Sequence, residues 1–278
     1  MRALTLDGSN CAIGEGKPPL VMAGLNVLED EGLAVEVAGE LKRICDGLGL
    51  SYIFKASFDK ANRSAIESPR GVGLEAGLKI LEAVKAGCGV PVVSDIHAPE
   101  QAAPVAAIVD VVQIPAFLCR QTDLLVAAAE ATRGRGKWLH VKKGQFLAPE
   151  DCRHIIAKLR AADPDARIVL GERGTSFGYH NLVVDMLGIA AMQSLGVPVV
   201  MDATHAAQLP GAGEASAGGR REGVPVLARA AIAAGADGIF LEFHPRPDDA
   251  PCDAPSCLPL SDAAELLADL KKISEAVR

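Results

Sequence analysis

The sequence has few aromatic residues and no excess of positive charge. Aromatic side chains make up 4% of its 278 residues, and 28 Lys and Arg stand against 35 Asp and Glu, a formal net charge of −7. That balance argues against a nucleic-acid-binding protein, whose affinity comes largely from cations on phosphates. Apolar runs near the ~20 residues of a membrane helix are also lacking, because Pro and Asp interrupt the most hydrophobic stretches. We therefore expect binding to neither nucleic acid nor a membrane.

Signals for disulfides and for export are missing as well. None of the seven cysteines forms a C-x-x-C pair, and their number is odd, so we expect reduced and mostly structural thiols. Polar residues at 7–10 fall where a secretory signal would need its apolar region. The expected location is the cytoplasm.

The sequence does contain a repeated βα pattern. Hydrophobic residues make up 49% of the chain, enough for a sizeable core. Short runs rich in Val, Ile and Leu recur, and most precede a stretch with apolar residues at helical spacing, such as 33–48, 74–84 and 266–277. Eight of these runs are predicted to be strands: 20–26, 52–57, 90–96, 111–115, 138–143, 168–173, 197–203 and 238–244.

Eight strands that alternate with helices predict an α/β fold, a (β/α)8 TIM barrel. A barrel of ~250 residues accounts for residues 1–278 as a single domain, with 1–19 as an N-terminal extension. We expect this extension to form a short β-hairpin on the barrel floor. A doubly wound open sheet is the competing fold, but no G-x-G-x-x-G motif follows the first predicted strand. Segments 211–219 and 245–259 are predicted to be long loops.

Polar residues mark the predicted carboxyl ends of the strands, where the active sites of such barrels lie. Side chains alternate along a strand, so Lys55 shares a face with Ser57, and Asp95 shares one with His97. Any one of these residues could form a salt bridge at the barrel rim. Together, however, five cations would converge on one mouth of an acidic protein, which indicates an anionic ligand with phosphate or carboxylate groups: Lys55, Lys60, Arg63, Lys142 and Arg173.

These cations alone do not define a reaction. A flexible lysine can activate an aldehyde electrostatically or form a Schiff base, and the spacing leaves both open. Carboxylates and imidazoles expected at the same mouth could orient sugar hydroxyls, transfer protons or hold a metal ion: Asp95, His97, His205, Glu242 and Asp253.

A series of longer motifs runs in the same order as in one known family. The first is FKASFDKANRS at 54–64, and the others include SDIH at 94–97, QIPAFL at 113–118, VKKGQF at 141–146, ERG at 172–174 and DATH at 202–205. From about residue 24 to residue 260 the chain resembles the 3-deoxy-D-manno-octulosonate 8-phosphate synthases.

This resemblance implies the condensation of phosphoenolpyruvate with arabinose 5-phosphate. In the family, the enol carbon adds to the aldehyde, water attacks the adjacent carbon, and inorganic phosphate leaves with carbon–oxygen cleavage. The product is a precursor in lipopolysaccharide biosynthesis, and no cofactor is implied. An Arg-bearing loop of the family reaches an adjoining subunit's site, so the resemblance also implies a homotetramer.

The resemblance carries over site residues motif by motif. It implies that phosphoenolpyruvate is held, with His205 close by, by Lys55, Ser57, Gln113, Lys142 and Arg173. It implies that arabinose 5-phosphate is bound by Asn62, Arg63 and Ser64 at its phosphate and by Asp95 at its hydroxyls, with Lys60 near the aldehyde. The residues expected to be catalytic are Asn26, Lys60, His205 and Asp253.

One position separates two branches of the resembled family. Metal-dependent members have a cysteine at the end of the first strand, with a His, a Glu and an Asp; the corresponding residues here are Asn26, His205, Glu242 and Asp253. A neutral amide is a poor replacement for a thiolate on a divalent ion. The resemblance therefore implies the metal-independent branch, with no metal ligand. A metal site built on Cys252 and Cys257 is the alternative, which the missing second cysteine pair disfavours.

Two other functions compete with this interpretation. The 3-deoxy-D-arabino-heptulosonate 7-phosphate synthases share the barrel, but they usually carry Lys-Pro-Arg-Thr where this chain has KANRS at 60–64. A barrel that has lost catalysis and only binds anions is the candidate from another class. The charged mouth argues against it, because a protein that has lost catalysis would be expected to keep the residues of its fold rather than the charged residues of its former site.

Other residues receive simpler interpretations. His140 and His244 are expected to cap strand ends, Trp138 to pack, and residues 131–137 to form a solvated loop. Arg220 and Arg221 fit closure over the substrate and contact with another subunit equally well.

Overall fold

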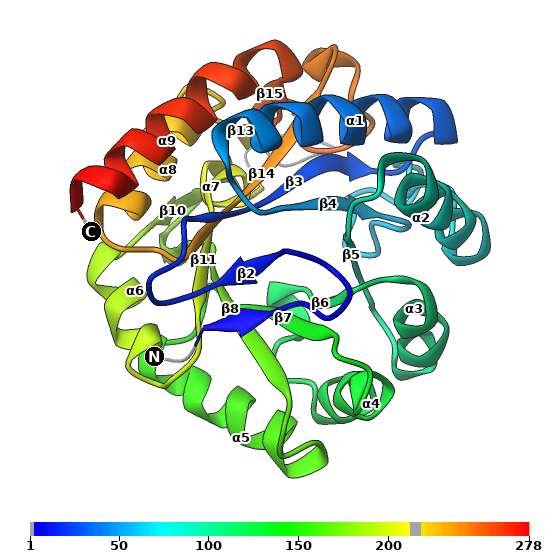
Figure 1. Ribbon diagram of the computed structural model, residues 1–278, viewed down its shortest axis with the longest axis vertical. Helices are drawn as coiled ribbons and strands as arrows, with labels where there is room; N and C mark the ends of the chain where they lie inside the picture. The colour runs from blue at the N-terminus through cyan, green and yellow to red at the C-terminus, as the bar shows by residue number, and fades with distance from the viewer. Residues whose placement is uncertain (1–2, 212–217, 278) are drawn as a thin grey trace.

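The computed structural model describes residues 3–211 and 218–277 (Figure 1). Residues 1–2 of the N-terminal extension and most of the loop predicted at 211–219 lie outside this part of the chain. The rest of the extension and all of the predicted strands lie within it.

Within the described residues, eight parallel strands close into a barrel. They are β3 (Leu20–Val27), β4 (Tyr52–Ser57), β5 (Val92–Asp95), β6 (Val111–Ile114), β7 (Trp138–Lys142), β8 (Arg167–Glu172), β11 (Val199–Asp202) and β14 (Gly238–His244). Each pairs with the next, and β14 closes the ring by pairing with β3 as well as β11. The predicted TIM barrel is confirmed, because an open sheet would leave two edges unpaired.

Helices form a ring around these strands (Figure 1). They are α1 (Glu31–Leu48), α2 (Leu74–Cys88), α3 (Ala102–Ile108), α4 (Thr122–Thr132), α5 (Cys152–Ala162), α6 (Met186–Gln193), α7 (Ala203–Ala206), α8 (Gly223–Ala233) and α9 (Ala263–Val277). Short 3-10 helices occur at Pro99–Gln101, Ala116–Leu118, Pro149–Asp151, Pro247–Asp249, Ala254–Ser256 and Leu260–Asp262.

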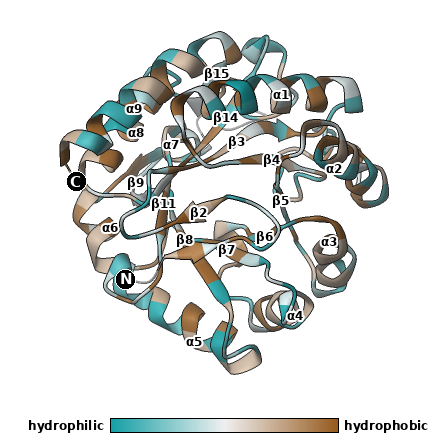
Figure 2. Ribbon diagram, in the orientation of Figure 1, coloured by the Kyte–Doolittle hydropathy of each residue, from teal (hydrophilic) through white to brown (hydrophobic). Residues whose placement is uncertain are grey.

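Helix α1 shows how local sequence sets these elements. Asp30 caps its N-terminus by accepting a hydrogen bond from the Leu33 amide at 2.9 Å, and Gly49 ends it with a φ of 67°. Val37 and Leu41 on one face are fully buried against the barrel. The hydropathy colours alternate along α1 and α9, as expected for helices with one face on the barrel and one in solvent (Figure 2).

Two layers of core hold the barrel together. One lies between strands and helices, and the other fills the barrel interior around Trp138 and Phe240. Trp138 is fully buried and its indole nitrogen donates to the Thr5 carbonyl at 3.4 Å. Its predicted packing role is confirmed.

The N-terminal extension forms the predicted hairpin. Strands β1 (Leu4–Thr5) and β2 (Ala12–Ile13) pair antiparallel, and Leu6 and Ile13 pack into the interior core. This hairpin lies across the middle of the helix ring (Figure 1). It covers the N-terminal end of the barrel, opposite the carboxyl ends of the strands.

Short strands lie outside the barrel or on its rim: β9 (Thr175–Gly178) with β10 (Asn181–Val183), β12 (Gln208–Leu209) with β13 (Gly218–Gly219), and β15 (Leu258–Pro259) beside β14. The solvated loop predicted at 131–137 is only partly correct. Arg133 and Arg135 are exposed, but α4 extends to the buried Thr132, and Lys137 donates to the Val109 carbonyl at 2.7 Å.

Candidate active site

A cavity of about 450 Å³ opens at the carboxyl ends of the barrel strands. It brings together most of the residues that the sequence singled out: Lys55, Lys60, Asn62, Arg63, Ser64, Asp95, Gln113, Lys142, Arg173, His205 and Asp253. Asn26 and Ser57 do not line it; Asn26 lies directly behind Asp253, and Ser57 is fully buried at the end of β4. The predicted convergence of cations at one mouth is observed.

Arg173 follows strand β8 and has an incompletely bonded guanidinium. Its Nη2 donates to Gln208 Oε1 at 3.1 Å, whereas Nε and Nη1 have no partner among the described residues. The side chain is only 6% exposed, so these donors are not turned outward to bulk water. A buried fork of free N–H groups beside a cavity suits a phosphate or carboxylate.

Lys55 on β4 is held by the end of β14. Its Nζ lies 2.5 Å from Glu242 Oε1 and 2.9 Å from the Asn26 carbonyl oxygen. Burial lowers the pKa of Lys55 from 10.5 to about 8, although the Glu242 carboxylate opposes this shift. Lys55 is thus a cation at neutral pH, but its charge is easily lost at higher pH.

Lys142 and His205 share a carboxylate. Lys142 Nζ lies 2.6 Å from Asp202 Oδ2, and His205 Nδ1 lies 3.0 Å from Asp202 Oδ1. The pKa of Asp202 is well below its ordinary value, because His205, Lys142 and Arg173 outweigh its burial. An ionised Asp202 orients the imidazole with Nδ1–H toward itself, which leaves Nε2 facing the cavity.

Phe240 forms the floor under these lysines. It is fully buried, with Lys142 Nζ 3.7 Å and Lys55 Nζ 5.3 Å from its ring centroid. An aromatic face attracts cations without providing a counter-ion. The ring thus adds a further attraction for both lysines beside their carboxylate partners Glu242 and Asp202.

Asp95 and Lys60 lie on the other side of the cavity. Asp95 Oδ2 lies 3.1 Å from His97 Nε2, and its Oδ1 has no partner among the described residues. The pKa of Lys60 is raised, because Glu242, Asp95 and Asp253 outweigh the effect of burial. Lys60 is therefore a stable ammonium and a poor candidate for a Schiff base, which needs a neutral amine.

The loop at 61–64 forms the rim. Asn62 and Ser64 are exposed, and Arg63 Nη1 lies 2.6 Å from the Cys252 sulfur. Burial raises the pKa of Cys252 to about 12, so the sulfur is a thiol. This loop offers polar groups to a ligand that projects out of the cavity.

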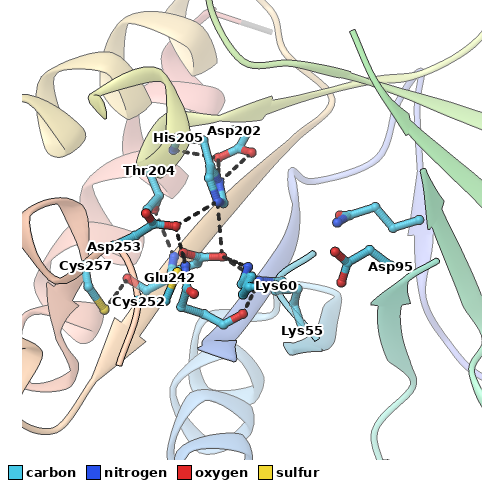
Figure 3. A network of polar contacts seen from close by, with 12 residues as sticks. Lys55, Lys60, Asp95, Asp202, Thr204, His205, Glu242, Cys252, Asp253 and Cys257 are labelled. Carbon is cyan, nitrogen blue, oxygen red and sulfur yellow. Dashed lines mark hydrogen bonds and ion pairs between the residues drawn. The ribbon is translucent and has the colours of Figure 1, made fainter. Parts of the chain in front are cut away.

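His205, Glu242 and Asp253 point toward one another (Figure 3), with one ligand atom from each within 4.8 Å of the others. The Asn26 Nδ2 amide donates to Glu242 Oε2 and, at 3.0 Å, to Asp253 Oδ2. A metal ion here would meet N–H donors in place of a fourth ligand, and no thiolate belongs to the cluster. His205, Glu242 and Asp253 are of the types that could hold a divalent ion, and Asn26 presents an amide to them where a thiolate would be a stronger ligand.

Comparison with known proteins agrees with this architecture. Residues 3–278 match the sequence model of the DAHP synthetase I family. The chain belongs to this family. Its relatives include proteins named 2-dehydro-3-deoxyphosphooctonate aldolase. The one from Citrifermentans bemidjiense is 52% identical over 99% of this chain and 98% of that protein, and the one from Nitratidesulfovibrio vulgaris is 55% identical over 91% of each.

Some residues of this site are identified only by their contacts in the structure. Phe240 and Gln208 were not predicted as site residues, because Phe240 has the character of an ordinary core residue and Gln208 does not lie at the end of a predicted strand. Glu242 was a candidate from the sequence and Asp202 is the first residue of the DATH motif, but only their contacts reveal that they neutralise the lysines.

Four further residues lie outside the cavity lining. Arg220 Nη2 donates to Asn181 Oδ1 at 2.9 Å and Arg221 Nη2 to the Ala254 carbonyl at 2.7 Å, which leaves both interpretations of this pair open. His244, the last residue of β14, accepts from the Arg246 amide at 3.0 Å through Nδ1, as a residue capping a strand end would. His140 lies instead inside β7, fully buried, with its ring against Gln113.

Proposed function

We propose that this chain condenses phosphoenolpyruvate with arabinose 5-phosphate and water, giving 3-deoxy-D-manno-octulosonate 8-phosphate and inorganic phosphate for lipopolysaccharide biosynthesis. The observation that carries the proposal is the set of buried cations around one cavity: Lys55, Lys142 and Arg173, with Arg173 only partly bonded. A small ligand with both a phosphate and a carboxylate matches three such cations.

The relatives' names support the choice of aldose. A phosphooctonate has eight carbons, which a three-carbon enol and a five-carbon aldose supply; a seven-carbon product would need a four-carbon aldose. Their identities of 52% and 55% to this chain favour the eight-carbon product over the competing heptulosonate phosphate. The non-catalytic barrel is disfavoured by the retained cations and by the same relatives.

In the proposed reaction, Arg173, Lys142 and Gln113 hold the phosphate and carboxylate of phosphoenolpyruvate over the Phe240 ring. The C3 carbon attacks the aldehyde carbon, and the Lys60 ammonium protonates or stabilises the developing alkoxide. Water adds to C2 and loses one proton to the group formed by His205 and Asp253. The C2–O bond to phosphate then breaks as the new C2 hydroxyl becomes the ketone and passes its proton to the leaving phosphate. Asn62, Arg63 and Ser64 would bind the aldose phosphate, and Asp95 its hydroxyls.

Ser57 and Asn26 have a supporting role in this proposal. Ser57 donates no observed hydrogen bond and is fully buried, so a contact with phosphoenolpyruvate requires movement at the end of β4. Asn26 acts from behind Asp253, where its amide holds Asp253 and Glu242 together. This contact supports a metal-independent reaction, because the amide does the positioning that a metal ion would do.

We also propose a homotetramer that works as single-domain subunits in the cytoplasm. Large apolar side chains stay exposed on β9 and the turn after it, with Phe177 86% and Tyr179 97% exposed. Such a patch suits contact with a second copy. Light scattering should give a particle mass of about four times the chain mass of 28.8 kDa. Phe177→Asp should lower this particle mass. The described residues contain no helix that could span a membrane.

The decisive experiment measures phosphate release from phosphoenolpyruvate by purified, chelator-treated protein. Release with arabinose 5-phosphate but not with erythrose 4-phosphate supports the proposed substrate and the metal-independent branch together. Preference for erythrose 4-phosphate would favour the seven-carbon product. Activity that is lost on chelation and restored by a divalent ion would contradict the assignment of Asn26, and no release with either aldose would leave the non-catalytic barrel.

A further inference from the structure

His140 is a buried imidazole that the proposed reaction does not use. It lies in the middle of β7, fully buried, in register with Gln113 on the neighbouring strand β6. In a parallel pair, residues in register project to the same face. Both side chains therefore point into the barrel, with His140 beneath the cavity and Gln113 lining it.

The contact between them has a defined direction. His140 Nδ1 lies 3.1 Å from Gln113 Oε1, whereas His140 Nε2 has no partner among the described residues. A buried N–H without an acceptor costs more than an unused lone pair, so the proton belongs on Nδ1. The amide oxygen of Gln113 then accepts from His140, and its NH2 group is left to face the cavity.

The ring of His140 cannot easily turn away. A Cβ atom at Gly171 of β8 would lie 2.7 Å from His140 Nε2, so the ring fills the space that a side chain at 171 would occupy. Phe240 packs on the ring with centroids 6.1 Å apart. Burial and the nearby Lys142 cation lower the pKa of His140 to about 3, against the opposing effect of Asp202. His140 is thus a fixed, neutral donor.

We propose that His140 is a positioning residue that holds the amide of Gln113 with its NH2 group toward the bound anion. The inference rests on the proposed function, in which Gln113 contacts phosphoenolpyruvate. Without the histidine, Gln113 could rotate and present its carbonyl oxygen to an anion, which would repel it. An effect on phosphoenolpyruvate affinity is therefore expected, with little effect on the chemical step.

The test compares two replacements that remove the ring. In His140→Asn the side-chain nitrogen is bonded to Cγ, as Nδ1 is in histidine, and can donate to Gln113. In His140→Leu the side chain has no donor. His140→Leu should raise the KM for phosphoenolpyruvate about tenfold, equivalent to about 1.4 kcal/mol, with kcat and the KM for the aldose within about twofold of wild type. His140→Asn should restore most of the affinity.

A packing role would give a different result, because both variants lose ring volume and would then change KM alike. A double-mutant cycle separates the two further. In a Gln113→Met background, His140→Leu should add almost nothing to KM if it acts through Gln113. Equal effects in both backgrounds, or equal effects of Asn and Leu, would overturn the proposal.

The tautomer provides a readout that does not depend on turnover. Nitrogen-15 spectra of histidine-labelled protein, with His140→Asn used to assign the signal, should show protonated Nδ1 and bare Nε2 across neutral pH. A proton on Nε2 or an imidazolium would overturn the inference even in an active enzyme. If the wild-type protein released no phosphate, the proposed function would be wrong. The hydrogen bond from His140 to Gln113 would still be tested by the tautomer.

Discussion

Glu242 is the carboxylate on which the charges of the active site depend. It is fully buried and neutralises Lys55 at 2.5 Å, with Lys60 at 4.0 Å and His205 Nε2 at 3.6 Å. Glu242→Gln preserves the shape and the acceptor oxygen but removes the negative charge. Lys55 would then be a buried cation without a counter-ion.

The expected loss of stability follows from these distances. At an effective dielectric constant of about 20, two unit charges 4 Å apart interact by about 4 kcal/mol, and Lys55 is closer than that. Relief of the carboxylate's own desolvation offsets part of this loss, and removing one partner of a buried pair typically costs about 3–5 kcal/mol. For a chain of this size, that corresponds to a fall in Tm of roughly 10 °C.

The same substitution should weaken phosphoenolpyruvate binding. Glu242 raises the pKa of Lys55 against the effect of burial, so its removal lets that pKa fall below about 8. More of the Lys55 amine is then neutral at pH 7.5, and less positive charge meets the ligand. Calorimetric titration with phosphoenolpyruvate at pH 6.5 and 8 should show a larger loss of affinity at the higher pH.

Urea and thermal unfolding followed by circular dichroism measure the stability change. Glu75→Gln is the matched control, because its partner Lys79 lies 3.4 Å away and their side chains are 90% and 74% exposed. It should change stability by no more than about 0.5 kcal/mol. The double variant Lys55→Met with Glu242→Leu should recover much of the stability but no activity. If Glu242→Gln unfolds within about 1 kcal/mol of wild type, Lys55 has lost its proton or its burial instead of remaining an uncompensated buried charge, and the estimated loss of stability is wrong.

Three further outcomes are expected. The lowered pKa of Lys55 makes it cationic below about pH 8 and neutral above, so kcat/KM for phosphoenolpyruvate should fall as pH rises through about 8. Lys55→Arg should abolish that fall. A pH profile of Lys55→Arg that matches wild type would contradict the role of Lys55. Asn26→Cys should replace the amide donor with a thiolate beside His205 and raise zinc or manganese affinity, whereas unchanged binding by calorimetry would show that residue 26 alone does not separate the branches. Gly171→Ala should lower Tm by several degrees through its clash with His140, and less so in a His140→Asn background; additive losses would refute the clash.

Much of the architecture follows from the order of residues alone. Strand ends, alternation and helical spacing act over a few neighbours, so the eight strands and the cations at their ends could be located without the fold. Lys55, Lys142 and Arg173 needed only the rule that parallel strands in a closed barrel end at the same rim. The N-terminal hairpin was predicted because residues 1–19 precede the first predicted barrel strand.

Contacts between distant parts of the chain depend on the closure of the barrel. Asn26 and Glu242 are separated by 216 residues and meet only because β14 pairs with β3. Likewise, the direction of the His140 donor depends on Gln113 in β6 and on the space left by Gly171 in β8. Phe240 looks like any core residue until two lysines lie over its ring. The sequence by itself determined which charges gather at the mouth; the tertiary structure decided which are neutralised, because electrostatic pairing depends on a few ångströms that local pattern does not specify.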